Sequence, residues 1–445
     1  MQSACIDTDP FETFDSIKAR PYAFFLDSSN DDRKLGRYSV MGSDPFLVFK
    51  SKASRITLEW ADGKNETFIG NPFLELKKLL ERYRTEGDGA LPFKSGAVGY
   101  FAYDMKDLVE KLPDAARDDL GLPDCIMGFY DKVTVFDHAE SRSSRAPLKV
   151  PYYVYDSGLV HPPVNIKSNF TFDEYIAAVK KAKDYIRRGD IYQVNISQRF
   201  EADFSGDPFG LYCRLRDVSP APFSAYLDFG DVKVLSSSPE RFLLKRGDHI
   251  ETRPIKGTRP RDEDAFRDSV LEKELIGSAK DRAEHIMIVD LERNDLGRVC
   301  EYGSVGPSEL FSLEKYSTVF HLVSTVSGKL KAGVDAVDCL MATFPGGSIT
   351  GAPKIRSMEI IEELEPVKRS IYTGAVGYIS FDGNMDTSIV IRTFIVKGGK
   401  VYFQVGGGIV ADSDPVAEYQ ETLDKARGMF AALGVTNPTY EVRRD

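Results

Sequence analysis

A lysine stands between two prolines in the stretch Thr252-Arg-Pro-Ile-Lys-Gly-Thr-Arg-Pro-Arg261. The prolines and the adjoining glycine predict that the backbone of Lys256 is held in a stiff turn rather than a helix. Three arginines lie within five residues of this lysine. Clustered positive charge disfavours another ammonium group, so the sequence predicts that Lys256 spends more time as a free amine nucleophile. The arginines would also attract an anionic substrate. A solvated basic surface loop is the alternative interpretation.

The composition is that of an ordinary globular enzyme. A length of 445 residues predicts a sizeable core and roughly two or three domains. Hydrophobic residues make up 42% and charged residues 28% of the chain, as is common in soluble enzymes. The net charge of -10 argues against a nucleic-acid or anionic-membrane partner. It leaves an acidic small substrate open, because the local potential decides that.

Cysteine usage and the chain start predict a cytoplasmic protein. The five cysteines are odd in number and form no Cys-x-x-Cys pair, which fits a reducing compartment without disulfides or a zinc site. The first residues show no basic-then-apolar signal pattern. No apolar run approaches the roughly 18 residues of a membrane-spanning helix.

Periodicity predicts strands in the first part of the chain and alternating strands and helices after it. The predicted strands are 22–26, 38–42, 46–49, 54–59, 96–103, 126–136, 191–200, 374–381, 388–397 and 401–405. The predicted helices are 72–83, 171–189, 266–278, 279–292, 335–343, 354–364 and 414–432. Strands in runs with interspersed helices predict an α+β fold in which two packed sheets are flanked by helices. A polar stretch with Pro162-Pro163 near its end places a domain joint at 140–165, between domains at 1–150 and 165–445.

Two predicted helices each carry an acidic pair at i, i+3. Asp281 pairs with Glu284, and Glu418 pairs with Glu421. This spacing puts both carboxylates of a pair on one helix face. Such a pair is commonly a solvated surface ladder, but an apolar run follows Glu284. A carboxylate on a buried helix needs a partner or a cation, so the four residues form a candidate magnesium site.

A single carboxylate follows a predicted apolar strand in Ser236-Ser-Ser-Pro-Glu-Arg241. A carboxyl group at a strand end with hydroxyl neighbours suits a general acid, and Glu240 is therefore a candidate. A plain surface pair with Arg241 is the alternative.

Two glycine-rich stretches fail the tests for nucleotide loops. Gly346-Gly-Ser-Ile-Thr-Gly-Ala-Pro-Lys354 lacks the Gly-Lys-[Ser/Thr] of a phosphate loop. Gly406-Gly-Gly-Ile-Val-Ala411 is not followed by a second strand with a terminal acid. Both stretches could still offer backbone N–H groups to a carboxylate.

Taken together, four motifs resemble the chorismate-utilising enzymes, which include the large subunits of anthranilate and aminodeoxychorismate synthases and the isochorismate and salicylate synthases. The resemblance covers the whole chain, densely from about 170 to 430. It is carried by Pro254–Thr258, Asp281–Asp295, Gly347–Lys354 and Gly406–Ser413. It implies the anthranilate synthase component I-like fold, an α/β/β/α sandwich with an N-terminal subdomain at 1–150 and a chorismate-binding catalytic domain at 165–445.

Two positions divide this family. Isochorismate and salicylate synthases have a lysine general base at the position where this chain has Gln193. The resemblance therefore does not imply addition of water at C2. Anthranilate synthases usually read Pro-Ile-Ala-Gly-Thr where this chain reads Pro-Ile-Lys-Gly-Thr. The lysine form resembles the aminodeoxychorismate synthase branch, which opens 4-aminobenzoate and folate synthesis.

The resemblance implies a mechanism for these residues. Mg²⁺ would bridge the ring carboxylate of chorismate to Glu284 and Glu421, with Asp281 and Glu418 holding its waters. Glu240 would protonate the leaving C4 hydroxyl while Lys256 attacks C2 to give a covalent adduct. Ammonia would then enter at C4 and expel the lysine, with pyruvate retained.

The resemblance also implies a set of substrate-contacting residues. For Arg392 the alternative is a core ion pair, and for Tyr372 a packed aromatic side chain. The implied set is Gln193, Thr258, His321, Ser348, Thr350, Tyr372, Arg392, Gly406, Gly407 and Lys425.

Partners and regulation are implied in the same way. The chain has no Gly-x-Cys-x-Gly nucleophile, so ammonia would come from free ammonium or from a separate glutamine amidotransferase subunit. The family's tryptophan pocket is implied at Ser28, Leu35, Gly36, Arg37, Tyr38, Pro222, Phe223 and Ser224. The pocket motifs are altered here to Phe25-Leu-Asp-Ser28 and Ser219-Pro-Ala-Pro-Phe-Ser224, which makes a feedback role doubtful. The rival functions are anthranilate synthase component I and a non-catalytic amino-acid-binding subunit.

Overall fold

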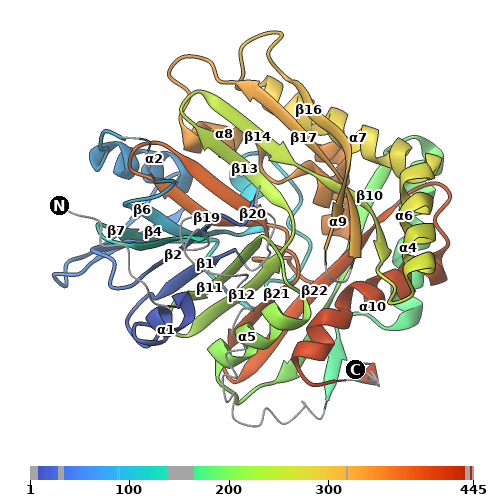
Figure 1. Cartoon of the computed structure of the whole chain (residues 1–445), viewed down its shortest axis with the longest axis horizontal. Helices are drawn as coiled ribbons and strands as arrows, with labels where there is room; N and C mark the ends of the chain where they lie inside the picture. The colour runs from blue at the N-terminus through green and yellow to red at the C-terminus, as the bar shows by residue number, and fades with distance from the viewer. Residues whose placement is uncertain are drawn as a thin grey trace.

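Two large β-sheets packed face to face form the core of the protein. The computed structural model describes residues 9–28, 35–87, 89, 91–138, 165–316, 319–435 and 441–442. In this part of the chain one sheet has 11 strands and the other has 12. All strand pairs are antiparallel except that of β23 with β9. Figure 1 shows the sheets at the centre, with α2 at one end and α4, α6 and α10 at the other.

The 11-stranded sheet contains strands from the start, middle and end of the chain. Across the sheet its strands are β23 (Glu441–Val442), β9 (Ile166–Ser168), β10 (Gln193–Asp203), β22 (Lys400–Ile409), β21 (Thr393–Lys397), β12 (Val232–Ser238), β11 (Phe223–Asp228), β1 (Phe24–Asp27), β2 (Tyr38–Gly42) and β8 (Thr134–Asp137), with β18 (Gly351–Ala352) beside β10.

The 12-stranded sheet also contains strands from distant parts of the chain. Across the sheet its strands are β15 (Ile255–Pro260), β17 (Val319–Lys329), β14 (His249–Arg253), β13 (Arg241–Arg246), β20 (Met385–Ile389), β19 (Ala375–Ser380), β6 (Gly96–Phe101), β7 (Cys125–Tyr130), β3 (Leu47–Lys52), β4 (Arg55–Trp60) and β5 (Asn65–Ile69), with β16 (Gly306–Lys315) beside β17.

Helices cover the outer faces of both sheets. One apolar cluster fills the space between the sheets and includes Phe24 and Val40 with Val98 and Tyr100. Two further clusters join the outer faces to helices. The described helices are α1 (Pro10–Asp15), α2 (Pro72–Arg82), η1 (Tyr103–Leu108), α4 (Phe172–Arg188), α5 (Pro208–Val218), α6 (Ala265–Gly277), α7 (Ala279–Gly297), α8 (Ala336–Thr343), η2 (Gly347–Ile349), α9 (Lys354–Leu364) and α10 (Pro415–Ala432). The predicted α+β class with two packed sheets is confirmed.

The sequence signals predicted both ends of α4 correctly but placed the end of α7 too early. In α4 the predicted capping box forms, because Thr171 accepts from the N–H of Glu174 while the Glu174 carboxylate accepts from the N–H of Thr171. Gly189 ends the helix with a φ of 82°, which glycine adopts without a steric cost. The helix predicted at 279–292 runs on to Gly297, because the polar residues after Val289 remain compatible with a helix.

Two predicted strands are each two strands that lie in different sheets. The stretch 126–136 divides into β7 of the 12-stranded sheet and β8 of the other. The stretch 388–397 likewise divides at 390–392 into β20 and β21. Both predictions were wrong because a crossing between sheets leaves the β-forming composition continuous. The second crossing contains Arg392, whose φ of 50° is rare for a non-glycine residue.

Both sheets contain strands from before and after the predicted domain joint. Most of the joint at 140–165 lies outside the described residues, so the domain division stays a prediction. Within the described residues, no helix has the length and apolar character to cross a membrane.

Candidate active site

The candidate site lies where the edge strand β15 faces β10 and β22 of the other sheet. Helix α7 packs on β15, and helix α10 packs on β22. Glu284 of α7 contacts Lys256, and the same lysine acts electrostatically on Glu418 and Glu421 of α10, so the carboxylates of the two helices lie near one another. In Figure 1 this region is on the right, where α7 and α10 flank the ends of β10 and β22.

Lys256 lies in a β-bulge, so the predicted turn was wrong. β15 pairs with β17 through Ile255 opposite Val323 and Thr258 opposite His321. Lys256 and Gly257 together oppose the single residue Leu322, which is the arrangement of a bulge. Gly257 has a φ of 89°, a conformation that glycine tolerates. Pro254 ends the preceding strand, as a residue without an N–H would, and the bulge redirects the lysine side chain.

The neighbour of the Lys256 side chain is a carboxylate. Its Nζ lies 3.3 Å from Oε2 of Glu284 on α7. Each nearby arginine has another partner: Arg253 binds Glu314, Arg259 binds Asp281 and Arg261 binds Asp268. The arginine cluster expected around the amine is thus neutralised by side chains that the sequence order does not reveal.

Glu240 is buried beside this lysine. Its Oε1 accepts a 2.6 Å hydrogen bond from Ser348 Oγ, and its carboxylate also accepts from the backbone N–H of Ile255. Burial raises the pKa of Glu240 to about 7, against the opposing effects of Ser348, Ile255 and Lys256. A carboxyl group that keeps its proton near neutral pH suits a general acid. The surface pair with Arg241 does not form, since Arg241 binds Glu251 and Asp386.

The acidic pair of α10 approaches the glycine strand β22. A methyl group added at Gly407 would lie 3.2 Å from Glu418 Oε2 and 3.6 Å from Glu421 Oε1. Burial raises the pKa of Glu418, while the neighbouring Lys425 lowers that of Glu421. Lys425 lies 2.8 Å from Glu421 and also donates to the carbonyl of Gly406.

The chemistry of these carboxylates fits a hard divalent cation, although Lys256 pairs with Glu284 and Lys425 pairs with Glu421. Among the described residues, no three acidic, histidine or cysteine side chains lie close enough together to hold a metal ion. Glu418 Oε2 is nevertheless buried without a hydrogen-bond partner, which is costly unless a ligand completes it. Glu284, Glu418 and Glu421 offer oxygen ligands of the kind that Mg²⁺ prefers. Asp281 is engaged with Arg259 at 2.9 Å.

A half-buried cation and a neutral imidazole lie near the bulge. Thr258 Oγ1 and His321 Nδ1 are 2.9 Å apart, and His321 Nε2 is buried without a partner. Burial and the nearby Arg392 lower the pKa of His321 to about 3. The guanidinium of Arg392 makes no ion pair within the described part of the chain, so the core ion pair does not form. A half-buried cation without a carboxylate partner suits an anionic ligand.

Gln193 and the glycines of β22 line the opposite wall. A methyl group at Gly408 would lie 2.8 Å from both Gln193 Nε2 and Lys256 Nζ. Both polar atoms of the Gln193 side chain are buried without partners. The glycines therefore leave room for the lysine, and Gln193 has free hydrogen-bonding capacity toward a bound molecule.

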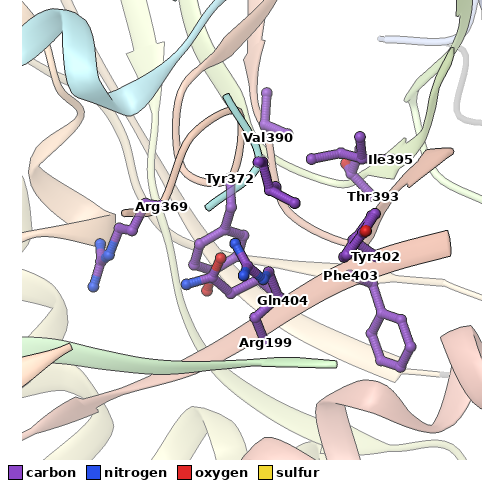
Figure 2. A pocket seen from close by; sticks show the side chains of 10 residues that line it. Arg199, Arg369, Tyr372, Val390, Thr393, Ile395, Tyr402, Phe403 and Gln404 are labelled. Carbon is purple, nitrogen blue, oxygen red and sulfur yellow. The ribbon is translucent and has the colours of Figure 1, made fainter. Parts of the chain in front are cut away.

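Two residues of the implied substrate set have other surroundings. Thr350 donates its hydroxyl hydrogen to carbonyls of its own turn. Tyr372 lines a cavity of about 10 Å³, the space of one water molecule. Figure 2 shows Tyr372, Arg369, Arg199 and Gln404 around this cavity. The substrate roles of Thr350 and Tyr372 stay predictions.

The segments of the implied tryptophan pocket meet on neighbouring strands. Ser28 donates to the carbonyl of Tyr38 at 2.9 Å, and Ser224 lies opposite Asp27 in the β1–β11 pairing. Arg37 binds Asp137. The other implied members, Leu35, Gly36, Pro222 and Phe223, adjoin these positions in the sequence. The pocket stays a prediction.

Several buried polar residues that support the site were missed from the sequence. Glu292 Oε1 accepts from the N–H of Gly347, next to Ser348, and Lys354 binds Asp295 and two carbonyls of the same loop. Arg369 and Glu365 form an ion pair at 2.7 Å with side chains 1% and 2% exposed. Lys354 was considered only as a phosphate-loop lysine. The i, i+4 spacing of Glu365 and Arg369 was visible but is common on helix surfaces.

The site combines a buried carboxyl group, an amine in a β-bulge and acidic side chains from two helices. These groups suit a class of enzyme that uses acid and nucleophilic catalysis. The comparisons identify that class. The chain belongs to the chorismate binding enzyme family, whose model matches residues 20–431.

Relatives with two different names are about equally similar. The aminodeoxychorismate synthase component 1 of Salmonella typhimurium is 42% identical, covering 94% of this chain and 95% of that protein. The anthranilate synthase component 1 of Acetivibrio thermocellus is 38% identical, covering 95% and 92%. The crystal structure of anthranilate synthase component I from Streptococcus pneumoniae superposes with a TM-score of 0.78 at 31% identity, covering 97% of this chain and 100% of that one.

Proposed function

We propose that this chain is an aminodeoxychorismate synthase component 1, which converts chorismate and ammonia to 4-amino-4-deoxychorismate through a covalent lysine adduct. The observation that carries the proposal is the position of Lys256. Its amine lies in the bulge of β15, beside Glu284 and against Gly408. Relatives named aminodeoxychorismate synthase component 1 reach 42% identity and those named anthranilate synthase component 1 reach 41%, so the choice between the two rests on Lys256.

The charges of the site suit the binding of a dianion such as chorismate. Arg392 is a half-buried cation without a carboxylate partner in the described residues. The imidazole of His321 has a free Nε2, and Gln193 has a free amide. These groups would orient the two carboxylates of the substrate between the sheets.

The first chemical step forms one bond and breaks another. The neutral amine of Lys256 attacks C2 of the ring, the ring double bonds shift, and the C4–O bond breaks. Glu240 gives its proton to the departing hydroxyl, which leaves as water, and the Ser348 hydrogen bond stabilises the carboxylate that results. Glu284, which lies 3.3 Å from Nζ, is placed to accept the proton that the amine must lose.

The second step reverses the electron flow. Ammonia attacks C4, the double bonds shift back, and the C2–N bond to Lys256 breaks as Glu284 returns its proton to the departing amine. The ammonium group formed at C4 gives one proton to the Glu240 carboxylate, which restores the acid. The amine returns to its starting state, and the enolpyruvyl group remains on the product. Mg²⁺, when bound by Glu284, Glu418 and Glu421, would supply the positive charge that neutralises the ring carboxylate.

Anthranilate synthase component 1 is the alternative, since relatives of that name are 38% to 41% identical. In that reaction ammonia itself adds at C2, and pyruvate is lost. Lys256 argues against it, because its Nζ already occupies the space over Gly408. Ammonia would come from a glutamine amidotransferase partner, as the designation "component 1" of the relatives suggests.

The product of the isolated chain distinguishes these functions. The purified chain is incubated with chorismate, Mg²⁺ and excess ammonium near neutral pH, where Glu240 keeps its proton. A stable amino product that needs a lyase to become 4-aminobenzoate supports the proposal. Anthranilate supports the alternative, and unchanged chorismate supports a non-catalytic binding subunit.

A further inference from the structure

The bulge that contains Lys256 requires a partner for its backbone. Because Lys256 and Gly257 oppose one residue of β17, the carbonyl of Lys256 lies outside the regular ladder. The ring of His285 takes this place, with Nδ1 at 3.3 Å from the carbonyl oxygen of Lys256. His285 is fully buried, and it directly follows Glu284 on α7. Two consecutive residues therefore hold the side chain and the carbonyl of the same lysine.

The other nitrogen of His285 is also bound. Nε2 lies 2.7 Å from Ser324 Oγ on β17. The Ser324 hydroxyl accepts in turn from the N–H of Phe311 at 3.1 Å. Phe311 lies in a second irregularity, where β16 shifts register against β17 between Glu309 and Ser312. Ser324 thus connects the irregular segments on both sides of β17.

The acceptors and donors of this chain of bonds fix one histidine tautomer. The carbonyl oxygen of Lys256 can only accept, so His285 Nδ1 must carry a hydrogen. The Ser324 hydroxyl accepts from Phe311 and donates its one hydrogen to Nε2. The order is Phe311 N–H to Ser324, Ser324 O–H to His285, and His285 Nδ1–H to Lys256. Each donor and acceptor in this chain of hydrogen bonds has a partner. Because all the bonds run in one direction, the imidazole of His285 cannot flip without losing two of them.

We propose that His285 and Ser324 are positioning residues that hold the bulge of β15 and thereby fix the amine of Lys256 for attack on the substrate. This inference rests on the proposed function, because it concerns the same nucleophile. The rings of His285 and Phe311 pack at an interplanar angle of 58° with centroids 5.5 Å apart, and this packing limits the space into which the bulge could relax. Loss of the bond at Lys256 would let the strand slip toward regular pairing, which turns the lysine away.

The test compares two substitutions of His285 with a matched control. His285→Asn keeps an N–H that can reach the Lys256 carbonyl, whereas His285→Leu fills similar space without a donor. Ile288→Val is the control, because Ile288 is fully buried on the same helix and has no polar role. We expect His285→Leu to lower kcat by about 10²-fold with little change in KM, as for a displaced nucleophile. His285→Asn should recover most of the rate, and Ile288→Val should keep it.

A second measurement follows the lysine directly. With chorismate and Mg²⁺ but no ammonia, His285→Leu should form the Lys256 adduct about 10²-fold more slowly than the wild type. Ser324→Ala removes a single oxygen atom and should slow the adduct as well, so it replaces His285→Leu if that variant does not fold. Adduct formation at the wild-type rate in these variants, or equal loss in His285→Asn and His285→Leu, overturns the inference.

The tautomer can be read without any substrate. In the ¹⁵N NMR spectrum of protein with labelled histidine, the signals of one of the five imidazoles should be missing from His285→Asn. This assigns those signals to His285. We expect its Nδ1 to carry the proton and its Nε2 to be unprotonated; the opposite tautomer overturns the inference. If the wild type forms no adduct with Lys256, the covalent function fails, while this spectrum still decides the hydrogen-bond chain.

Discussion

The hydroxyl of Ser348 donates a 2.6 Å hydrogen bond to Oε1 of Glu240. Because burial raises the pKa of Glu240 to about 7, this carboxyl group should be protonated below that pH and ionised above it. A general acid must begin protonated, so kcat/KM should fall as the pH rises above about 7. The measurement is the pH profile of kcat/KM for chorismate at saturating ammonia, which shows where this fall begins. A profile that is flat from pH 6 to about 9 contradicts the assignment of Glu240.

Ser348→Ala should shift the fall of kcat/KM at high pH, the alkaline limb of the profile, in a defined direction. The hydrogen bond favours the carboxylate and therefore lowers the pKa of Glu240 against the effect of burial. Without it the pKa of Glu240 should rise, and the alkaline limb should shift to higher pH. Ser308→Ala is a suitable control, because that hydroxyl binds only a carbonyl on β17. A limb that stays in place would mean that another group limits the rate.

The carboxylates of α7 and α10 should control the dependence on magnesium. Glu284→Gln and Glu421→Gln remove a negative ligand without changing size, so we expect turnover to be abolished while the fold survives. Asp290→Asn is the matched control on α7, where Asp290 is 73% exposed. The measurement is the rate as a function of Mg²⁺ concentration. Full activity of the wild type with magnesium chelated would refute the metal site.

The nitrogen source should show which part of the reaction this chain performs without a partner subunit. With glutamine alone we expect the isolated chain to be inactive, because the sequence has no Gly-x-Cys-x-Gly nucleophile. With ammonium it should turn over, and the rate should rise with pH as more free ammonia forms until the limb of Glu240 is reached. Glutamine-driven turnover by the pure chain would contradict the need for an amidotransferase.

The buried pair of Glu365 and Arg369 should matter for stability. Arg369 donates to the carbonyls of Ile349 and Asn195 as well as to Glu365. Arg369→Met leaves a buried carboxylate without its cation, which should cost about 3–5 kcal/mol. The double variant Arg369→Met with Glu365→Gln should recover part of this loss. The urea midpoint measures both, and a single variant as stable as the wild type would contradict the expectation.

Much of the fold could be predicted because local signals agree with it. The capping box at Thr171 and the glycine at 189 fix the ends of α4. The crossings between sheets could not be predicted, because residues such as Val390 and Ile391 have the same β-forming character as the strands on either side. The choice of sheet depends on pairing with strands that are distant in sequence.

The site residues were predicted through motifs, and their partners were not. Glu284 and Lys256 were both singled out, but their 3.3 Å contact arises from packing of α7 on β15. His285 stands inside a quoted motif, yet its role depends on Ser324, 39 positions away. A buried histidine with two partners has no local pattern that distinguishes it from a core residue.

The covalent role of Lys256 is tested most directly by mass spectrometry of the wild-type chain. Chorismate and Mg²⁺ are added without ammonia, and the peptide that contains Lys256 is analysed. We expect a mass increase on this peptide that disappears when ammonium is added and is absent from Lys256→Ala. That variant should be much slower or should aminate C2 directly, since the space over Gly408 is then open. An unmodified lysine, together with 4-amino product from Lys256→Ala at the wild-type rate, would contradict the account.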